Sequence, residues 1–388
     1  MIVKIDNLSH DLKGITRING KVTFVDNALP GEVVNIKIFD EKKNFNKGKV
    51  ISYIEKSKDR IENICPYFDR CGGCSFGGTI EYKKNIFMDI FKRYANIDIN
   101  PNVIYSDNIY GYRNKISMKI NNGKLSLVEE NSTELVDIDK CLLCNDKINM
   151  VIEKLSSVNL DGLNEVIIRG TDSIMVILKG KYDYDKIIKL LDGYVESIIY
   201  NDVCVYGEEY ITINVDKYRY RVYSESFFQI NTRMISKLYD MVKEYAGTGD
   251  KLLDLYCGAG TIGIYLSDSF NRVRGVEINK DAIRGANLNK EINNIKNISF
   301  ELSNANNIEI NEDVVVVDPP RSGLDDKTRI IIINSNIKKL VYVSCNPITL
   351  ARDINIFKDK YDIIDITLVD NFPNTVHMES VCLLERSK

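Results

Sequence analysis

The sequence predicts an α/β fold, in which a C-terminal sheet of parallel strands follows a small β-barrel and an α+β middle region. Three observations support this prediction: strand-like runs alternate with helical patterns after Ser226, short β-runs fill the first sixty residues, and a mixture of both lies between them. At 388 residues the chain is too long for one ordinary core. We therefore expect three domains, at residues 1–58, 59–222 and 223–388.

The first sixty residues are predicted to form the barrel. Their β-runs span Gly20 to Val25, Val33 to Phe39 and Lys49 to Tyr53, and turn signals at 28–31 and 46–48 separate them. These sixty residues hold twelve Lys or Arg against eight Asp or Glu, whereas the whole chain has a net charge of −3. A basic end on an acidic chain is typical of a surface that binds a polyanion, although a solvated lysine-rich face would have the same composition.

The middle region mixes strand and helix patterns without strict alternation. The predicted strands include Lys115 to Ile120, Glu165 to Arg169 and Ser173 to Leu178, and the predicted helices include Asp146 to Leu155 and Asp183 to Leu191. This arrangement indicates an α+β domain.

The C-terminal region has the strand and helix rhythm of a parallel sheet with right-handed crossovers. Its predicted strands lie at 252–255, Val273 to Glu277, Ile298 to Leu302, Val314 to Val317 and Lys339 to Ser344, with helical patterns between most of them. The chain has no internal repeat and no low-complexity tract.

The composition excludes a membrane role. Hydrophobic residues make up 44% of the chain and charged residues 28%, and no apolar run approaches the roughly 20 residues that span a bilayer. Asp6 and Asp11 interrupt any secretory pattern at the N-terminus, so we expect a cytoplasmic protein whose nine cysteines are reduced. Nothing in the sequence implies a protein partner.

A glycine-bearing turn predicts a site for a nucleotide-like cofactor. Leu252 to Leu255 reads as a strand, and Tyr256-Cys257-Gly258-Ala259-Gly260 follows it before a helix. In an open α/β sheet ligands bind outside the carboxyl ends of the strands, where glycines let the backbone approach the ligand. Glu277 ends the next strand, where a carboxylate can accept hydrogen bonds from ribose hydroxyls. Nicotinamide dehydrogenases share this pattern, but they do not require the segments described next.

Cys345 is the predicted nucleophile. It follows a strand in Val343-Ser344-Cys345-Asn346-Pro347, and Asp318 follows the preceding strand in Asp318-Pro319-Pro320-Arg321. A thiolate that adds to carbon 6 of a pyrimidine makes carbon 5 nucleophilic, and Asp318 is placed to hold the ring edge. Most lone cysteines are small buried apolar residues, as we expect for Cys204 and Cys382. The polar neighbours of Cys345 favour the catalytic interpretation.

The same chemistry requires a base that removes the proton from carbon 5. The C-terminal segment Pro373 to Glu379 supplies Glu379, and His377 lies two residues before it. We assign Glu379 as the base and His377 to a supporting position, although a carboxylate near a terminus is more often an exposed surface charge.

Five cysteines in two groups predict a metal centre. Cys65, Cys71 and Cys74 lie in one short loop, and Cys141 and Cys144 follow some seventy residues later. In a reducing compartment thiols at this spacing favour a metal over disulfides. Two C-x-x-C pairs are compatible with zinc, whereas the additional Cys65 favours an iron-sulfur cluster.

Together these motifs resemble the RNA uridine-5-methyltransferase family over nearly the whole chain. The resemblance implies a Rossmann-like S-adenosylmethionine methyltransferase domain, an OB-like TRAM barrel carrying Ala28-Leu29-Pro30-Gly31-Glu32, and a central iron-sulfur domain. It implies that the cofactor contacts are Gln229, Tyr256, Glu277 and Asp318, that the nucleophile and base are Cys345 and Glu379, and that a [4Fe-4S] cluster is held by Cys65, Cys71, Cys74 and Cys141. The chain departs from the family pattern at Thr261, Asn304 and Leu142.

Members with such a cluster resemble the enzymes that make 5-methyluridine in 23S ribosomal RNA, so ribosomal RNA is the expected substrate and transfer RNA the alternative. A cytosine-5 methyltransferase would carry a cysteine after the proline turn, where this chain has Arg321. An RNA-binding or iron-sulfur protein without activity is a further alternative, which the presence of Cys345, Asp318 and Glu379 disfavours.

Overall fold

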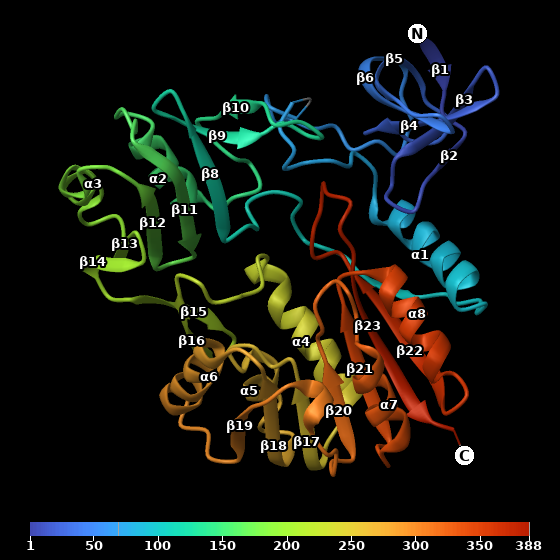
Figure 1. The fold of residues 1–388 in the computed structure, drawn as a ribbon, viewed down its shortest axis with the longest axis vertical. Coiled ribbons are helices and arrows are strands. Elements are labelled where there is room, and N and C mark those ends of the chain that lie inside the picture. The colour runs from blue at the N-terminus through green and yellow to red at the C-terminus, as the bar shows by residue number, and fades with distance from the viewer. Residues whose placement is uncertain (69, 388) are drawn as a thin grey trace.

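The computed structural model of the chain describes residues 1–68 and 70–387. Figure 1 shows three regions: a blue barrel at the N-terminus, a green sheet with two helices, and a larger yellow to red unit that contains the C-terminus. The mixed α/β fold predicted from the sequence is confirmed. In the part of the chain that the structure describes, every helix is too short or too polar to cross a lipid bilayer.

The barrel is a single six-stranded sheet with the order β1-β5-β6-β4-β3-β2. Its strands are β1 (Ile2–Lys4), β2 (Asn7–Leu8), β3 (Gly14–Ile18), β4 (Lys21–Asp26), β5 (Val33–Glu41) and β6 (Phe45–Glu55). Alternating apolar residues enclose a small core of Ile5, Val25, Ala28, Val34 and Ile36. Arg60, which follows the last strand, is bound to the barrel by a hydrogen bond from its Nη2 to Oε2 of the fully buried Glu32 at 2.7 Å.

The middle sheet has seven strands in the order β10-β9-β8-β11-β12-β13-β14. They are β8 (Lys115–Asn121), β9 (Lys124–Val128), β10 (Leu135–Asp137), β11 (Leu163–Gly170), β12 (Ile174–Gly180), β13 (Ser197–Tyr200) and β14 (Val203–Gly207), with helices α2 (Asp146–Leu155) and α3 (Tyr184–Leu191). The helices bury Ile148, Ile152 and Ile187 against the sheet in one apolar cluster. A separate hairpin of β15 (Tyr210–Val215) and β16 (Tyr218–Tyr223) leads to the C-terminal unit.

The C-terminal sheet has eight strands in the order β19-β18-β17-β20-β21-β23-β22-β7. The strands are β7 (Asn102–Ile104), β17 (Gly249–Leu255), β18 (Phe270–Glu277), β19 (Ile298–Leu302), β20 (Val314–Val317), β21 (Lys339–Ser344), β22 (Tyr361–Val369) and β23 (Glu379–Arg386). The expected parallel sheet is a mixed one, because β23 runs antiparallel to both β21 and β22. The apolar run of β23 carries no information about strand direction, so the sequence pattern did not reveal this insertion.

Helices cover both faces of this sheet. They are α1 (Ile80–Tyr94), α4 (Thr232–Ala246), α5 (Thr261–Leu266), α6 (Lys280–Ile292), α7 (Asp326–Asn334) and α8 (Pro347–Phe357), and a short 3-10 turn, η1 (Ala305–Asn307), precedes β20. Val314 and Val316 of β20 face the cluster that contains α4 and α5, whereas Val315 and Val317 face α1, α7 and α8. A continuous run of β-branched residues is therefore buried on both sides, as expected for a central parallel strand.

Residues 80–104 pack with the C-terminal sheet, whereas the predicted domain division places them in the middle region. β7 pairs in parallel with β22, and α1 buries Phe87 and Phe91 in the same cluster as Phe357 of α8. The segment that follows the cysteine loop thus crosses to the C-terminal sheet before the chain returns to form the middle sheet (Figure 1).

Candidate active site

One edge of the C-terminal sheet gathers the predicted cofactor and catalytic residues. β17, β18, β20 and β21 are parallel neighbours or near neighbours, so their carboxyl ends lie at the same edge. Tyr256 follows β17, Glu277 ends β18, Asp318 follows β20 and Cys345 follows β21. We call this group the strand-end site.

Glu379 reaches the strand-end site because β23 is antiparallel. Ser380 pairs with Ser344, the last residue of β21, and Glu379 pairs with Val369 of β22. The first residue of β23 is therefore beside the residue that follows β21. Glu379 is 3% exposed, and burial together with the charge of Asp318 raises its pKa to about 8.

Cys345 is held between a strand end and the N-terminus of α8. Asn346 caps this helix by accepting a hydrogen bond from the Ile348 amide at 3.1 Å, and Pro347 occupies its first position. The thiol is half-buried, and burial followed by the charges of Glu379 and Asp318 raises its pKa to about 11. Cys345 is thus not enclosed in an apolar interior, and a cation beside it would favour the thiolate.

Arg321 supplies that cation, a role that the sequence alone did not reveal. Its guanidinium hydrogen-bonds the Cys345 thiol and lowers the pKa of that group, which partly offsets burial. Its Nη2 also lies 3.3 Å from Nδ1 of His377. The side-chain Nδ2 of Asn346 donates to the Arg321 carbonyl at 2.9 Å, which ties the Asp-Pro-Pro-Arg turn to the loop that carries Cys345. The one sequence feature that could have pointed to Arg321 is its position directly after Asp318-Pro319-Pro320.

His377 is present at the edge of the site as a neutral ring. Burial, followed by the positive charges of Arg321, Lys83 and Arg113, lowers its pKa to about 4. A histidine that stays neutral near pH 7 can accept or donate a hydrogen bond but carries no charge.

The glycine turn brings the backbone close to Glu277. Tyr256, Gly258 and Gly260 all have a positive φ, and a Cβ on Gly260 would lie 2.5 Å from Cζ of Phe300. The Gly258 amide donates to Oε2 of Glu277 at 3.2 Å, and the Asn279 amide donates to Oε1 at 2.8 Å. The carboxylate is thereby fixed and keeps unused acceptor positions, because each oxygen can accept two hydrogen bonds.

Asp318 follows β20, and Tyr256 follows the neighbouring strand β17. Burial raises the pKa of Asp318 to about 7. Burial also raises the pKa of Tyr256, whose hydroxyl hydrogen-bonds the Thr328 side chain at the start of α7.

Gln229 contacts the site through Asn371. Its Oε1 lies 3.5 Å from Nδ2 of Asn371, and the Asn371 side chain hydrogen-bonds Glu379 and lowers the pKa of that carboxyl. Asn231, the N-cap of α4, donates from Nδ2 to the Asn371 carbonyl at 2.9 Å. The segment before α4 therefore orders the residues around Glu379.

The loop that joins β22 to β23, residues 370–378, is fixed by contacts from three directions. Lys83 of α1 donates to the carbonyls of Phe372 and His377, both at 2.9 Å. The Tyr112 hydroxyl donates to the Pro373 carbonyl at 2.9 Å, and the amide of Ser75 donates to the Asn374 carbonyl at 3.1 Å. This red loop extends from the sheet toward the cysteine loop in Figure 1, so the segment that leads into Glu379 touches the residue directly after Cys74.

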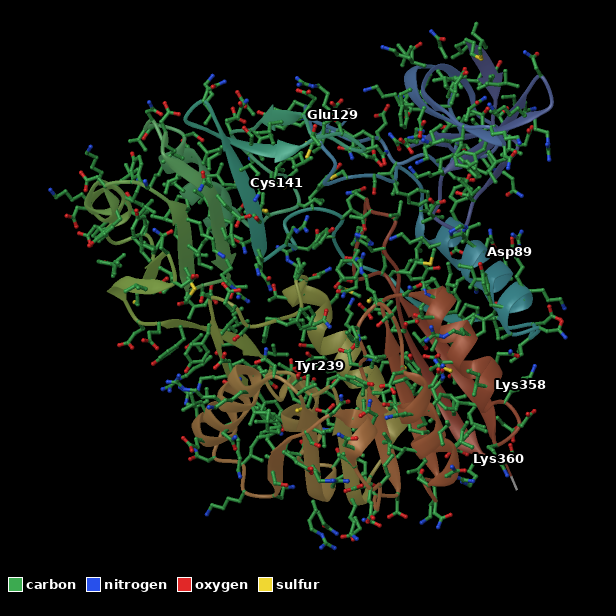
Figure 2. All side chains as sticks on the ribbon, viewed as in Figure 1. Asp89, Glu129, Cys141, Tyr239, Lys358 and Lys360 are labelled. Atoms are coloured by element: carbon green, nitrogen blue, oxygen red, sulfur yellow. The ribbon has the colours of Figure 1, made fainter. Side chains whose placement is uncertain are left out.

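The four cysteines assigned to the cluster line one cavity of about 320 Å³, together with Arg113. Figure 2 shows Cys141 in the middle region, apart from Tyr239 of α4 in the C-terminal unit. Burial raises the pKa values of Cys65, Cys71 and Cys74, whereas a hydrogen bond with Cys144 lowers that of Cys141 to about 6. Within residues 1–68 and 70–387, however, no group of three or more His, Cys, Asp or Glu side chains is arranged to hold a metal ion. The predicted cluster therefore has no support from the geometry beyond the shared cavity.

Comparison with known proteins identifies the family. The family described as tRNA (Uracil-5-)-methyltransferase matches residues 198–387, and the TRAM domain matches residues 1–51. An uncharacterized RNA methyltransferase of Halalkalibacterium halodurans is 32% identical, over 99% of this chain and 96% of its own length. Another from Aquifex aeolicus is 32% identical, over 98% and 97%. The chain belongs to the RNA uracil-5-methyltransferase family.

The methyltransferase also resembles a solved structure over its full length. The Pyrococcus abyssi tRNA (uracil-54, C5)-methyltransferase in complex with S-adenosyl-L-homocysteine has a TM-score of 0.82 and 27% identity, and the match covers 99% of this chain and 100% of that one. The prediction of an S-adenosylmethionine-dependent RNA uracil-5-methyltransferase with a TRAM domain is confirmed at this level. S-adenosylmethionine as cofactor and RNA as partner are confirmed with it.

Proposed function

We propose that the methyltransferase transfers a methyl group to carbon 5 of a uridine in 23S ribosomal RNA through a covalent Cys345 adduct. The observation that carries the chemistry is the convergence of Cys345, Glu379 and Asp318 at one sheet edge, with Arg321 beside the thiol. A thiol, a base and a hydrogen-bonding carboxyl are the groups that alkylation of carbon 5 requires.

In the proposed reaction the Cys345 thiolate forms a bond from Sγ to carbon 6 of the uracil. The electron pair of the double bond between carbons 5 and 6 moves toward carbon 5 and the carbonyl at position 4, where the developing charge needs a hydrogen-bond donor. Arg321 lowers the pKa of the thiol and so favours the attacking form. Asp318, with its pKa raised to about 7, is placed to donate or accept a hydrogen bond at the ring edge.

After carbon 5 has received the methyl group, it carries both that group and its original proton. Glu379 in its carboxylate form takes this proton. The electron pair of the broken bond re-forms the double bond and expels the Cys345 thiolate, which restores the thiolate and the aromatic ring, and Glu379 then releases the proton to solvent. The hydrogen bond from Asn371 lowers the pKa of Glu379 and favours the basic form.

The residues at the glycine turn fit the cofactor. S-adenosylmethionine, when bound, supplies a methyl group on a positively charged sulfonium. Glu277 keeps acceptor positions for ribose hydroxyls, and Asp318, Tyr256 and Gln229 complete the set that we propose to hold the cofactor. Two carboxylates near a cation are electrostatically favourable.

We also propose that Cys65, Cys71, Cys74 and Cys141 hold a [4Fe-4S] cluster. Four thiols that line one cavity of about 320 Å³ are the donor set of such a cluster, and the space exceeds what a single ion needs. Burial raises the pKa of Cys71 and Cys74, and the positive charge of Arg113 at this cavity partly offsets that shift. Metal analysis of an anaerobic preparation is expected to find iron and sulfide. One zinc ion per chain instead would contradict the cluster and indicate a zinc site.

Transfer RNA is the second candidate substrate, because the Pyrococcus abyssi relative is named for uracil 54 of tRNA. Mass spectrometry of 5-methyluridine in ribosomal and transfer RNA from a deletion strain separates the two. Loss from 23S ribosomal RNA alone is expected. Loss from transfer RNA alone would assign the second substrate. Methylation of unmodified transcripts by the purified protein, followed by position mapping, then names the uridine.

A further inference from the structure

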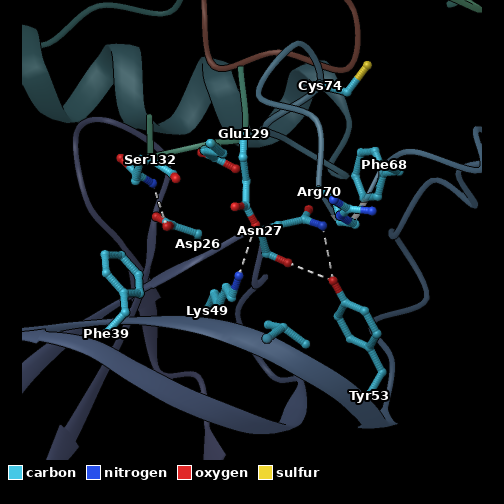
Figure 3. Close-up of a pocket in the computed structure, with 13 residues that line it drawn as sticks. Asp26, Asn27, Phe39, Lys49, Tyr53, Phe68, Arg70, Cys74, Glu129 and Ser132 are labelled. Atoms are coloured by element: carbon cyan, nitrogen blue, oxygen red, sulfur yellow. Dashed lines mark hydrogen bonds and ion pairs between the residues drawn. The ribbon is translucent and has the colours of Figure 1, made fainter. Parts of the chain in front are cut away.

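A second cavity, of about 230 Å³, lies at the seam between the barrel and the turn that joins β9 to β10. We call it the seam cavity. Three segments that are distant in sequence supply its walls (Figure 3): the barrel strands β4 to β6 and their ends, the cysteine loop, and the turn at 129–132. It shares none of its lining residues with the strand-end site.

Hydrogen bonds and an ion pair hold these segments together. Asn131 donates from Nδ2 to Oδ2 of Asp26 at 2.7 Å, and Lys49 Nζ lies 3.2 Å from Oε1 of Glu129. The Glu130 amide donates to the Arg70 carbonyl at 3.3 Å. The cavity is thus built by contacts between the barrel and the middle region, and its shape depends on both.

The charges of the seam cavity are largely balanced. Asp26 forms an ion pair with Lys13, and Glu129 forms one with Lys49. Glu130 is half-buried in the cavity wall, where burial and the charge of Asp26 raise its pKa to about 7. The lining carries three carboxyl groups and two cations, Lys49 and Arg70, so its charges nearly cancel and it is better suited to an uncharged polar ligand than to a phosphate.

Aromatic side chains form part of the wall. Phe39 of β5 is 41% exposed, and Tyr53 and Phe68 are half-buried. Figure 3 shows Phe39 on one side of the group that contains Asn27 and Glu129, with Tyr53 and Phe68 on the other. Flat apolar faces next to hydrogen-bonding groups are the features by which proteins bind single unstacked bases.

We propose that the seam cavity binds one unstacked nucleobase of the RNA substrate, distinct from the methylated uridine, and selects a base that carries an exocyclic amino group. The inference rests on the proposed function, since it takes RNA as the substrate. Glu129 and Glu130 offer carboxyl oxygens, which accept hydrogen bonds from the amino groups of adenine, cytosine or guanine. Uracil has no exocyclic amino group, so it has fewer hydrogen-bond donors to give to these carboxyl oxygens.

The test compares Phe39→Ala and Glu130→Gln with Ile54→Ala, an exposed residue of β6 that does not line the cavity. With an unmodified 23S ribosomal RNA or transfer RNA transcript, whichever the wild type methylates, Phe39→Ala is expected to raise KM about tenfold while kcat at saturating RNA stays unchanged. Glu130→Gln is expected to raise KM by a smaller factor, and Ile54→Ala by none. Equal KM values for all four proteins would overturn the proposal.

Photo-crosslinking identifies the base. With p-benzoylphenylalanine in place of Phe39, the crosslink on the transcript is expected at one adenine, cytosine or guanine, and the same group in place of Ile54 is expected to give none there. Crosslinks that are absent, scattered, or at the target uridine would contradict the proposal. Its failure is distinct from that of the proposed function, because methylation of the transcript by the wild type is scored in the same assay.

Discussion

The strand-end site and the cavity lined by Cys65, Cys71, Cys74 and Cys141 both hold thiols in partly buried surroundings, yet the groups next to those thiols differ. Cys345 has two carboxyl groups and one arginine beside it, and its pKa is about 11. In the cavity, Cys65, Cys71 and Cys74 have one another, Cys141 and an arginine as neighbours. A single thiol next to a base suits a transient covalent bond, whereas several thiols around one space suit a permanent ligand set. The residue type is therefore less informative than the groups around it.

Replacement of Cys345 tests this contrast most directly. Cys345→Ala is expected to abolish methylation of the RNA transcript and also trapping of RNA that contains 5-fluorouridine, because both require the bond from Sγ to carbon 6. The readouts are methyl transfer to the transcript and a shifted protein band after incubation with the fluorinated RNA. Cys204→Ala, in β14 of the middle sheet, is the matched control and is expected to retain both. Turnover by the Cys345 variant would refute the assigned nucleophile.

Replacement of Glu379 is expected to separate the two halves of the reaction. In Glu379→Gln the adduct can form and accept a methyl group, but release needs the base, so turnover should fall by about 10² to 10⁴. Denaturing gels with unsubstituted RNA should then show a covalent complex that the wild type does not accumulate. Glu385→Gln, near the other end of the same strand, serves as the control. Slow turnover without an accumulated complex would assign Glu379 to an earlier step.

Lys83 connects the two regions, since it lies on the helix that follows the cysteine loop and holds the loop that leads into Glu379. It is 2% exposed, donates to two carbonyls of residues 370–378, and lies 3.7 Å from Asp370. Lys83→Met is expected to lower kcat about tenfold to a hundredfold by displacing Glu379, with some covalent complex accumulating. Lys84→Met, on the same helix, is the matched control. A loss of stability with normal kcat in the folded fraction would limit Lys83 to a structural role.

The sequence predicts the strand-end site better than its surroundings, for a physical reason. Parallel strands place their carboxyl ends at one edge, so the positions of Glu277, Asp318 and Cys345 after apolar runs imply that they meet. Glu379 joins them only because β23 is antiparallel, and strand direction leaves no mark on an apolar run. Its assignment from the sequence therefore came from the need of the chemistry for a base, which the family resemblance matched, and not from a predicted place in the sheet.

Long-range packing explains the other differences. Asn102 to Ile104 is too short to show a pattern, and its partner strand β22 begins at Tyr361. In the sequence, Arg321 was notable only because it stands where a cytosine-5 methyltransferase would carry a cysteine. Its contacts with Cys345 and His377 involve two other segments of the chain, so no local pattern predicts them. The seam cavity is also assembled from three separate segments, so no local run of residues signals it.

The smallest expected effect concerns pH and the carboxyl groups buried around the strand-end site. Asp254 of β17 is fully buried, accepts one hydrogen bond from the Gly263 amide at 2.8 Å, and has a pKa raised by burial from 3.8 to about 8. The folded protein thus binds this proton more tightly than the unfolded chain. Between about pH 4 and pH 8 unfolding releases the proton, so the free energy of unfolding falls as the pH rises through this window.

Asp254→Asn is expected to reduce the fall in the free energy of unfolding across this window by at least about 1 kcal/mol, since each unit of pKa shift corresponds to about 1.4 kcal/mol. The measurement is denaturant unfolding from pH 5 to pH 8.5. Asp250→Asn is the matched control on the same strand, because hydrogen bonds from Asn271 and Arg272 lower the pKa of the exposed Asp250. That variant should leave the slope above pH 5 unchanged. If both variants kept the slope of the wild type, the pH dependence would have to come from other groups. Burial would then raise the pKa of Asp254 by less than its surroundings imply.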